Sequence, residues 1–303
     1  KTFLYIKDRF EEIERDIINL NPDDEGVVDD DVAEQVFIDE MNKKAGLLGC
    51  ENLRFKNASG LSAAGQLTSP KDFAIITRHA AGIDELIKVW GAKTYEVNVK
   101  GSNPRKVPIS TTVQDEVFEQ DYKILGGKTG TLGVVKNLSL VAQHREKGHI
   151  LIGTVLRAND DRWTAMKQLL DETINVIEDN PSEGFTVDSI GACSAVLPAN
   201  PLLHTSDDLN EVYIQNNDQL TSPASLTKIL TSMVLIENIP NLSESFVYKS
   251  RDAQEDDLHF NEGDQVTFKD ALYLMMLQSN NTTAKAVARV VGQKIVKARG
   301  YVQ

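Results

Sequence analysis

Residues 220–230 read Leu-Thr-Ser-Pro-Ala-Ser-Leu-Thr-Lys-Ile-Leu, and the rest of the chain is interpreted outward from this stretch. An apolar run follows directly and predicts a helix. Ser225 and Lys228 then lie one turn apart on one face, near the N-terminus of that helix. A serine hydroxyl becomes a nucleophile when a base takes its proton, and a neutral lysine beside it can be that base. The stretch therefore predicts a Ser-x-x-Lys nucleophile.

Two further short motifs accompany this pair. Ser279-Asn280-Asn281 stands at the junction between two predicted helices, and Lys128-Thr129-Gly130-Thr131 stands on a strand predicted at a sheet edge facing a cleft. Each motif is weak alone, because an isolated Lys-Thr-Gly is usually a surface turn. Their occurrence together, each in a fitting local context, favours a single active site.

Acyl-transfer chemistry gives most of these residues a role. Ser225 would attack a carbonyl carbon, and Lys228 would accept the hydroxyl proton. That role requires the pKa of Lys228 to lie below the ordinary lysine value of about 10.4, and burial and the cation Lys128 would both lower it. The N–H groups of Ser225 and Thr131 are predicted to form an oxyanion hole. Gly130 would let the acyl group approach the strand closely.

The remaining candidates concern the substrate and the leaving group. Lys128 and Thr129 suit a substrate carboxylate, one as a point charge and the other as a hydroxyl donor. Ser279 can relay a proton to the leaving amine, and Asn281 can bind the substrate amide or the lysine of the nucleophile pair. Arg157 is a further candidate for the carboxylate, with an ion pair at a strand end as the alternative.

The motif set resembles that of the D-alanyl-D-alanine carboxypeptidases, the low-molecular-mass penicillin-binding proteins with the serine β-lactamase-like fold. The resemblance covers roughly residues 37–180 and 190–296 and includes the segments 37–49, 55–61, 68–72 and 263–266. It implies removal of the terminal D-alanine from peptidoglycan stem peptides through an acyl-serine intermediate. It also implies covalent inhibition by β-lactam antibiotics and an extracytoplasmic place at the bacterial cell wall.

The implied fold is α/β (α+β): an antiparallel sheet flanked by helices, plus a mostly helical subdomain. The family order is Ser-x-x-Lys, Ser-x-Asn, Lys-Thr-Gly, but here Lys-Thr-Gly comes first, so the order is predicted to be circularly permuted. Residues 1–36 form an acidic helical segment outside the resemblance. We then expect part of the helical subdomain with a hairpin over 37–115, the α/β subdomain over 116–235, and the rest of the helical subdomain over 236–303.

Two other functions stay open. A class A β-lactamase needs a glutamate-bound water, and its Glu-x-x-Leu-Asn segment is missing; Glu51-Asn52-Leu53 lies in a carboxypeptidase-like stretch instead. The peptidase is therefore favoured. A non-catalytic penicillin-recognising scaffold, with the acidic segment as its interaction surface, would require misplaced rather than missing catalytic side chains.

Bulk properties narrow the partners. A chain of 303 residues suffices for one large domain or two modest ones. The net charge of -13 argues against nucleic acid or an anionic membrane surface. Cys50 and Cys193 are expected as buried free thiols, and the histidines lack ligand spacing, so no cofactor and no metal is predicted. No apolar run approaches a membrane span of ~18 residues. The chain opens on Lys1 and shows no signal peptide, which fits a removed leader.

Periodicity and turn residues also predict the order of the elements. Helices are expected over 8–20, 32–48, 71–81, 83–90, 160–179, 268–278 and 282–296, with a further one opening at Ser225; strands are expected over 94–99, 107–113, 137–144, 149–157, 190–197 and 212–215.

Overall fold

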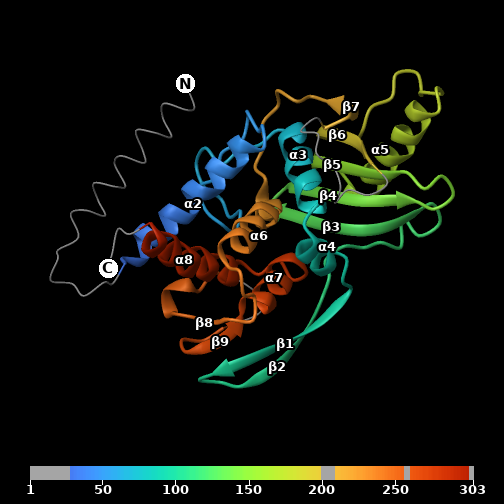
Figure 1. Ribbon diagram of the computed structural model, residues 1–303. Helices are drawn as coiled ribbons and strands as arrows, with labels where there is room; N and C mark the ends of the chain where they lie inside the picture. Colours follow the sequence, from blue (N-terminus) through green and yellow to red (C-terminus); the bar gives the residue numbers. More distant parts are fainter. Residues whose placement is uncertain (1–27, 199–208, 256–259, 300–303) are drawn as a thin grey trace.

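The computed structural model describes residues 28–198, 209–255 and 260–299. A five-stranded antiparallel sheet with helices on both faces stands beside a mainly helical part that carries a small four-stranded sheet (Figure 1). The predicted fold class, an α/β arrangement of antiparallel sheets flanked by helices, is confirmed. The helix predicted over 8–20 lies outside the described residues.

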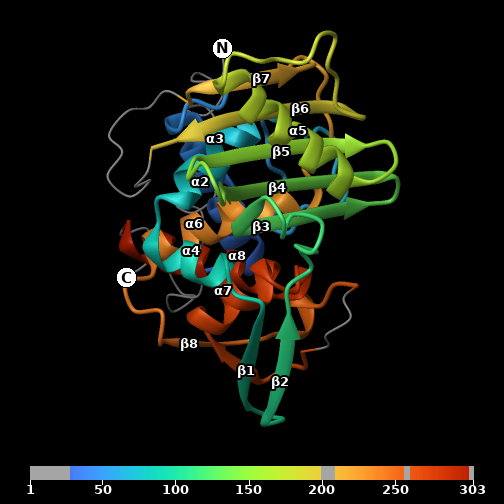
Figure 2. The same ribbon diagram turned by 90° about the vertical axis from the view of Figure 1, so that its right-hand side faces the viewer.

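The large sheet places the Lys-Thr-Gly motif at an edge. Its order is β3-β4-β5-β6-β7, every neighbouring pair is antiparallel, and Figure 2 shows β3 nearest the helical part. The edge position predicted for residues 128–131 is therefore confirmed, because they lie within β3. The strands are β3 (Tyr122–Leu132), β4 (Val135–His144), β5 (Ile150–Ala158), β6 (Ser189–Leu197) and β7 (Glu211–Gln215).

Alternating side chains give this sheet two buried faces. Ile152 belongs to the core that contains α3 (Pro70–Ala81), whereas Leu151 belongs to the core that contains α5 (Arg162–Ile177). Ser69 caps the first of these helices and Asp161 the second, each accepting backbone N–H bonds at the helix start. The sheet that includes the motif strand is therefore packed between helices on both of its faces.

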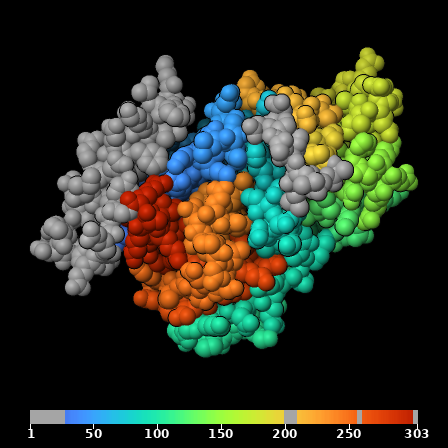
Figure 3. All heavy atoms as spheres, viewed as in Figure 1, coloured from blue at the N-terminus to red at the C-terminus, as the bar shows by residue number. Residues whose placement is uncertain are grey.

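The helical part is built around α6, in which residues 227–235 are all buried. Figure 3 shows α8 in dark red against α2 in blue, and these helices approach closely because Gly292 has no side chain. A Cβ atom at Gly292 would lie 1.9 Å from the carbonyl oxygen of Ala33. The helices are α2 (Asp30–Leu47), α4 (Asp84–Trp90), α6 (Thr227–Asn238), α7 (Phe268–Met276) and α8 (Asn281–Ala298).

The small sheet has the order β2-β1-β9-β8. The hairpin predicted between residues 94 and 113 is confirmed as β1 (Thr94–Gly101) and β2 (Arg105–Ser110). The strands β8 (Ser245–Val247) and β9 (Asp264–Thr267) were not predicted, because each is too short to show an alternation of apolar and polar residues.

Two sequence expectations concern the rest of the molecule. Cys50 and Cys193 are both free thiols, as predicted, although Cys50 is only half-buried. Within the described ranges, no helix is both long and apolar enough to cross a bilayer.

Candidate active site

Ser225 lies in a 3-10 turn, η2 (Ala224–Leu226), immediately before α6. The sequence placed it at the start of the helix itself, and the difference arises at Ala224. Its φ of 47° lies in the left-handed region, which a non-glycine residue adopts at a cost of ~1–3 kcal/mol. Thr227 Oγ1 donates to the carbonyl oxygen of Ala224 at 2.8 Å and holds this conformation. The turn presents Ser225 half-exposed above α6, whose residues 227–235 are buried.

Lys228 is the predicted partner of this serine, and the structure brings the two together. Its ammonium nitrogen is completely buried and donates to Ser225 Oγ at 2.9 Å. It also donates to Asn281 Oδ1 at 2.7 Å and to the carbonyl oxygen of Ser59 at 2.6 Å. The Ser59 contact was missed by sequence reasoning, since a main-chain carbonyl leaves no mark on residue type.

These contacts suit a lysine that works as a base. The oxygens of Ser59 and Asn281 can only accept hydrogen bonds, so they can take two N–H bonds of a neutral amine. In a neutral amine that kept those two bonds, the 2.9 Å contact with Ser225 would run from the serine O–H to the lysine nitrogen. The arrangement orients Lys228 Nζ to receive the serine proton.

The Ser279-Asn280-Asn281 motif forms the entrance to α8. Asn280 is the N-cap, and its Oδ1 accepts from the backbone N–H of Thr283 at 2.7 Å. Ser279 has a φ of 60° and, like Ala224, is a non-glycine residue in the left-handed region. Capping turns the next side chain, Asn281, toward Lys228. The junction between helices that was expected for this motif is thus observed.

Lys128 lies on β3 and is completely buried. Burial, followed by the positive charges of Lys228 and Arg162, holds the pKa of Lys128 well below its ordinary value. The neighbouring Thr129 is half-exposed, and its Oγ1 lies 2.8 Å from Thr112 Oγ1. Three basic side chains, Lys128, Lys228 and Arg162, therefore gather in one region of a chain whose net charge is -13, and those that carry a proton favour an anionic ligand there.

Arg162 rather than Arg157 reaches the motif strand. From the first turn of α5, its guanidinium donates to Thr131 Oγ1 at 2.7 Å and to the carbonyl oxygen of Gly130 at 3.1 Å. Arg157 has an exposed side chain, and what it contributes is a backbone N–H to Asn137 Oδ1. The sequence offered Arg157 as a candidate because it lies on a strand after the motif, with an ion pair at a strand end as an equal alternative. The first turn of the following helix gave no sign that Arg162 would reach the motif strand.

The close approach of strand and turn depends on Gly130. A Cβ atom there would lie 3.0 Å from the carbonyl oxygen of Pro223 and 3.3 Å from Ala224 Cβ. The turn with Ser225 therefore rests almost directly on the backbone of β3. Sequence reasoning assigned the glycine to the approach of the acyl group, and the structure shows that it also admits the turn.

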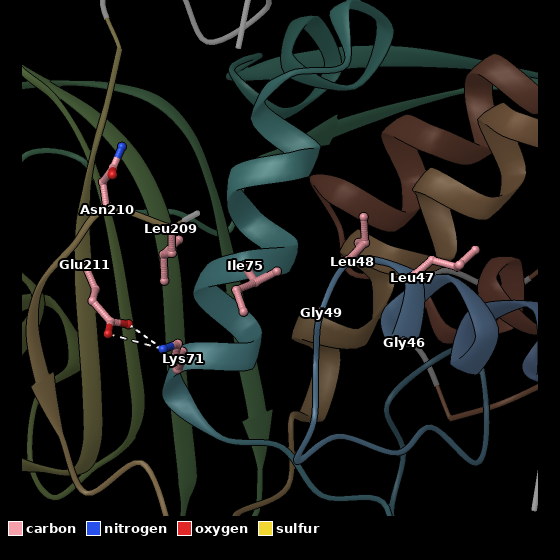
Figure 4. A pocket seen from close by; sticks show the side chains of 9 residues that line it. All are labelled: Gly46, Leu47, Leu48, Gly49, Lys71, Ile75, Leu209, Asn210 and Glu211. Atoms are coloured by element: carbon pink, nitrogen blue, oxygen red, sulfur yellow. Dashed lines mark hydrogen bonds and ion pairs between the residues drawn. The ribbon is translucent and has the colours of Figure 1, made fainter. Parts of the chain in front are cut away.

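A separate hollow of about 540 Å³ lies between the end of α2, the start of α3 and β7 (Figure 4). Lys71 and Glu211 face each other across one side as an ion pair, and Ile75 and Leu48 supply apolar walls. None of the predicted catalytic or substrate-binding residues lines it. It therefore lies apart from the candidate catalytic residues.

Comparison with known proteins agrees with the motif analysis. A family model described as D-alanyl-D-alanine carboxypeptidase matches residues 32–160 and 207–295, which is most of the chain. Both matched blocks contain motif residues: Lys128 to Thr131 in the first, and Ser225, Lys228 and the motif at residue 279 in the second.

A curated protein of Bacillus subtilis (strain 168), D-alanyl-D-alanine carboxypeptidase DacF, is 26% identical over 238 residues. The alignment covers 74% of this chain and 60% of that protein, so the chain spans less than two thirds of the relative's length. No solved structure shows a significant match.

Proposed function

Because the chain belongs to the D-alanyl-D-alanine carboxypeptidase family, we propose that it removes the terminal D-alanine from peptides that end in D-alanyl-D-alanine. The observation that carries this proposal is the 2.9 Å hydrogen bond between Lys228 Nζ and Ser225 Oγ in a buried setting. This bond places a candidate base, Lys228, beside a candidate nucleophile, Ser225.

The reaction would proceed by acyl transfer. Ser225 Oγ attacks the carbonyl carbon of the penultimate D-alanine, and Lys228 Nζ takes the hydroxyl proton. The backbone N–H groups of Ser225 and Thr131 stabilise the oxyanion. The tetrahedral intermediate expels D-alanine, whose amine receives a proton relayed through Ser279. Water then hydrolyses the ester on Ser225 and regenerates the free hydroxyl.

The cations of the site would bind the carboxylate of the terminal D-alanine. Lys128 contributes charge from a buried position, Thr129 a hydroxyl, and Arg162 a planar guanidinium at the end of the same strand. Asn281 would hold the substrate amide as well as the lysine base. A free carboxylate at the end of the substrate is thus what the site selects, which supports a carboxypeptidase.

The natural substrate would be the peptidoglycan stem peptide, encountered outside the cytoplasm at the bacterial cell wall. β-Lactam antibiotics would acylate Ser225 as covalent inhibitors, because they present a reactive amide and a carboxylate at similar positions. No cofactor or metal enters this chemistry.

Mass spectrometry after exposure to benzylpenicillin tests the proposal. We expect one penicilloyl group, mapped to the peptide that contains Ser225, and release of D-alanine from a D-alanyl-D-alanine peptide; Ser225→Ala should abolish both. An adduct that turns over within seconds would instead favour a β-lactamase. A chain that takes no label on Ser225 would favour the non-catalytic scaffold, although the hydrogen bond to Lys228 supports catalysis.

We further infer that the motif order is circularly permuted, with α5 leading on into β6. With this inference we also propose that the chain divides into the segments 1–36, 37–115, 116–235 and 236–303. Its acidic first segment, 1–36, overlaps the start of α2 at Asp30, and the family match begins at residue 32.

A further inference from the structure

Asn137 is a polar side chain with no exposed surface, placed on β4 directly opposite Gly130 of β3. Its Nδ2 donates to the carbonyl oxygen of Ser222 at 2.9 Å and to that of Pro223 at 3.0 Å. These two carbonyls belong to the segment that leads into the nucleophile turn. A side chain of the sheet thus attaches to the backbone next to Ser225.

The amide of Asn137 is fixed in orientation. Its Oδ1 accepts the backbone N–H of Arg157 at 2.8 Å, so the oxygen must face β5 and the nitrogen must face the turn. Its own main-chain carbonyl accepts from Arg162 Nη1 at 2.9 Å. One residue therefore joins the end of β5, the guanidinium of Arg162 and the nucleophile turn.

The same place is where the turn meets β3. Gly130 leaves room for Pro223 and Ala224, and Asn137 Cβ lies 3.3 Å from where a Cβ on Gly130 would stand. The two hydrogen bonds from Asn137 Nδ2 add to this van der Waals contact on the β3 side of the turn. Asn137 supplies directional contacts there, which specify one position.

We propose that Asn137 is a positioning residue that sets the distance between Ser225 and β3. The oxyanion hole of the proposed reaction takes one N–H from Ser225 and the other from Thr131, so its width equals the spacing that Asn137 fixes. A hole whose donors miss the oxyanion by an ångström loses about 100-fold in rate. This inference rests on the proposed function.

Asn137→Asp and Asn137→Leu test the assignment. The aspartate keeps an acceptor for the Arg157 N–H but loses both donors to the turn, whereas the leucine keeps only the volume. Ser139→Ala is the matched control, because Ser139 is also fully buried, lies two residues along β4 and bonds to Thr77 and Thr154 rather than to the turn.

The measurement is the pre-steady-state rate of acylation by a fluorescent penicillin. It separates the acylation rate constant from the affinity of non-covalent binding. The burst amplitude gives the fraction of molecules that can be acylated. We expect both Asn137 variants to acylate about 10- to 100-fold more slowly, with binding changed less than about threefold and a full burst amplitude. Ser139→Ala should lower the melting temperature and leave the acylation rate at the parent value.

Hydrogen exchange gives a measurement that does not depend on activity. Backbone amides of residues 222–227 should exchange faster in Asn137→Asp, while those of β4 and β5 stay protected. Three results would overturn this inference and leave the proposed function standing. They are an acylation rate in both Asn137 variants equal to that of the parent, an equal slowing in Ser139→Ala, or an unchanged hydrogen exchange rate at residues 222–227. A parent chain that takes no penicillin label would overturn the proposed function, and the inference with it.

Discussion

A Cβ atom on Gly60 would lie 1.9 Å from the carbonyl oxygen of Ala224, the residue before the nucleophile. Gly60 has a φ of 87° and Ala224 a φ of 47°, so two left-handed residues meet backbone to backbone. The residue before Gly60, Ser59, accepts from Lys228. The loop at 57–61 therefore fixes both the turn that carries the nucleophile and the lysine that activates it.

Gly60→Ala should consequently disturb catalysis beyond its effect on stability. The new methyl group must push the Ala224 carbonyl away, and displacement of about 1 Å at Ser225 costs on the order of 100-fold in acylation rate. Gly65→Ala is the control: Gly65 also has a positive φ, 77°, but a Cβ there would meet only the flexible side chain of Lys56 at 3.8 Å. It should lose about 1–2 kcal/mol of stability, because alanine is strained in the left-handed region, and it should acylate normally. Equal acylation rates in the two variants would contradict the argument.

The buried position of Lys128 predicts a pH dependence of substrate binding. Its pKa lies well below the ordinary value of 10.5, with burial as the main cause. The side chain is charged below that lowered pKa and neutral above it, so affinity for a carboxylate substrate should fall as pH rises, starting below pH 10.5. KM for a D-alanyl-D-alanine peptide, measured against pH, should rise on the alkaline side.

Lys128→Arg separates this titration from others in the site. Arginine stays protonated throughout the accessible range, so the alkaline rise in KM should disappear, although KM itself will be higher because the guanidinium fits the cavity less well. An alkaline rise of unchanged midpoint in Lys128→Arg would assign it to another group.

Arg162 and Arg157 make a matched pair for testing carboxylate recognition. Arg162→Gln removes a cation hydrogen-bonded to the motif strand, and a hydrogen bond to a charged group contributes about 1.5–3 kcal/mol. KM should therefore rise by about 10- to 100-fold with a smaller change in kcat. Arg157→Gln, on an exposed side chain, should change KM less than twofold. A larger effect at Arg157 would assign carboxylate recognition to Arg157, the candidate named from the sequence.

The catalytic motifs were predictable because they depend on residue type and short spacing. Ser225 and Lys228 lie one turn apart in any helix, and a strand that starts a run of consecutive strands readily becomes a sheet edge. The features that the sequence did not reveal are main-chain atoms and backbone angles. The carbonyl of Ser59 looks like any other, and the positive φ of Ala224 is accommodated by Gly60, a residue distant in sequence.

Burial explains why Asn137 also escaped notice. Asn137 is one polar residue near the start of a largely apolar strand. From the sequence alone it could equally be an exposed residue of the preceding turn, because its hydrogen-bond partners are not visible there. Its bonds join residues 85 and 86 positions apart, and no local pattern carries such a pairing.

The ion pair between Arg289 and Asp252 should be the strongest single electrostatic contact in the helical part. Asp252 has no exposed surface and Arg289 is 3% exposed; the guanidinium makes two bonds to the carboxylate, at 2.8 and 2.6 Å. Removing one partner of a buried pair costs about 3–5 kcal/mol, so Asp252→Asn should lower the free energy of unfolding by that amount in urea titration.

Glu244→Gln is the exposed counterpart, since Lys294 and Glu244 are both more than 40% exposed and bond at 2.8 Å. Such pairs contribute ~0–1 kcal/mol. Both pairs join α8 to a neighbouring segment, and α8 begins at Asn281, which contacts the lysine base. A similar loss in the two variants would show that burial does not govern the strength of these pairs.

The circular permutation that we infer predicts that the chain tolerates a cut between α5 and β6. Residues 178–184, which link α5 to β6, are all exposed. The segments before and after this link are also joined by non-covalent contacts: the antiparallel pairing of β5 with β6, and the hydrogen bond from Thr173 Oγ1 to Ser194 Oγ at 2.6 Å. If this link merely joins segments that relatives keep apart, its covalent continuity is dispensable. A protease site inserted between Glu183 and Gly184, once cleaved, should leave two fragments that co-elute and still label with penicillin on Ser225.

Cleavage at another exposed turn gives the comparison. Gly133 and Val134 form the turn between β3 and β4, and Val134 is 75% exposed. A cut there is equally accessible but frees the end of β3, including Thr131, from the hairpin that holds it. Penicillin labelling should fall after this cut and survive the cut at 183. Loss of labelling at 183 would mean that the link between α5 and β6 is integral to the fold, and the permuted order would lose its structural basis.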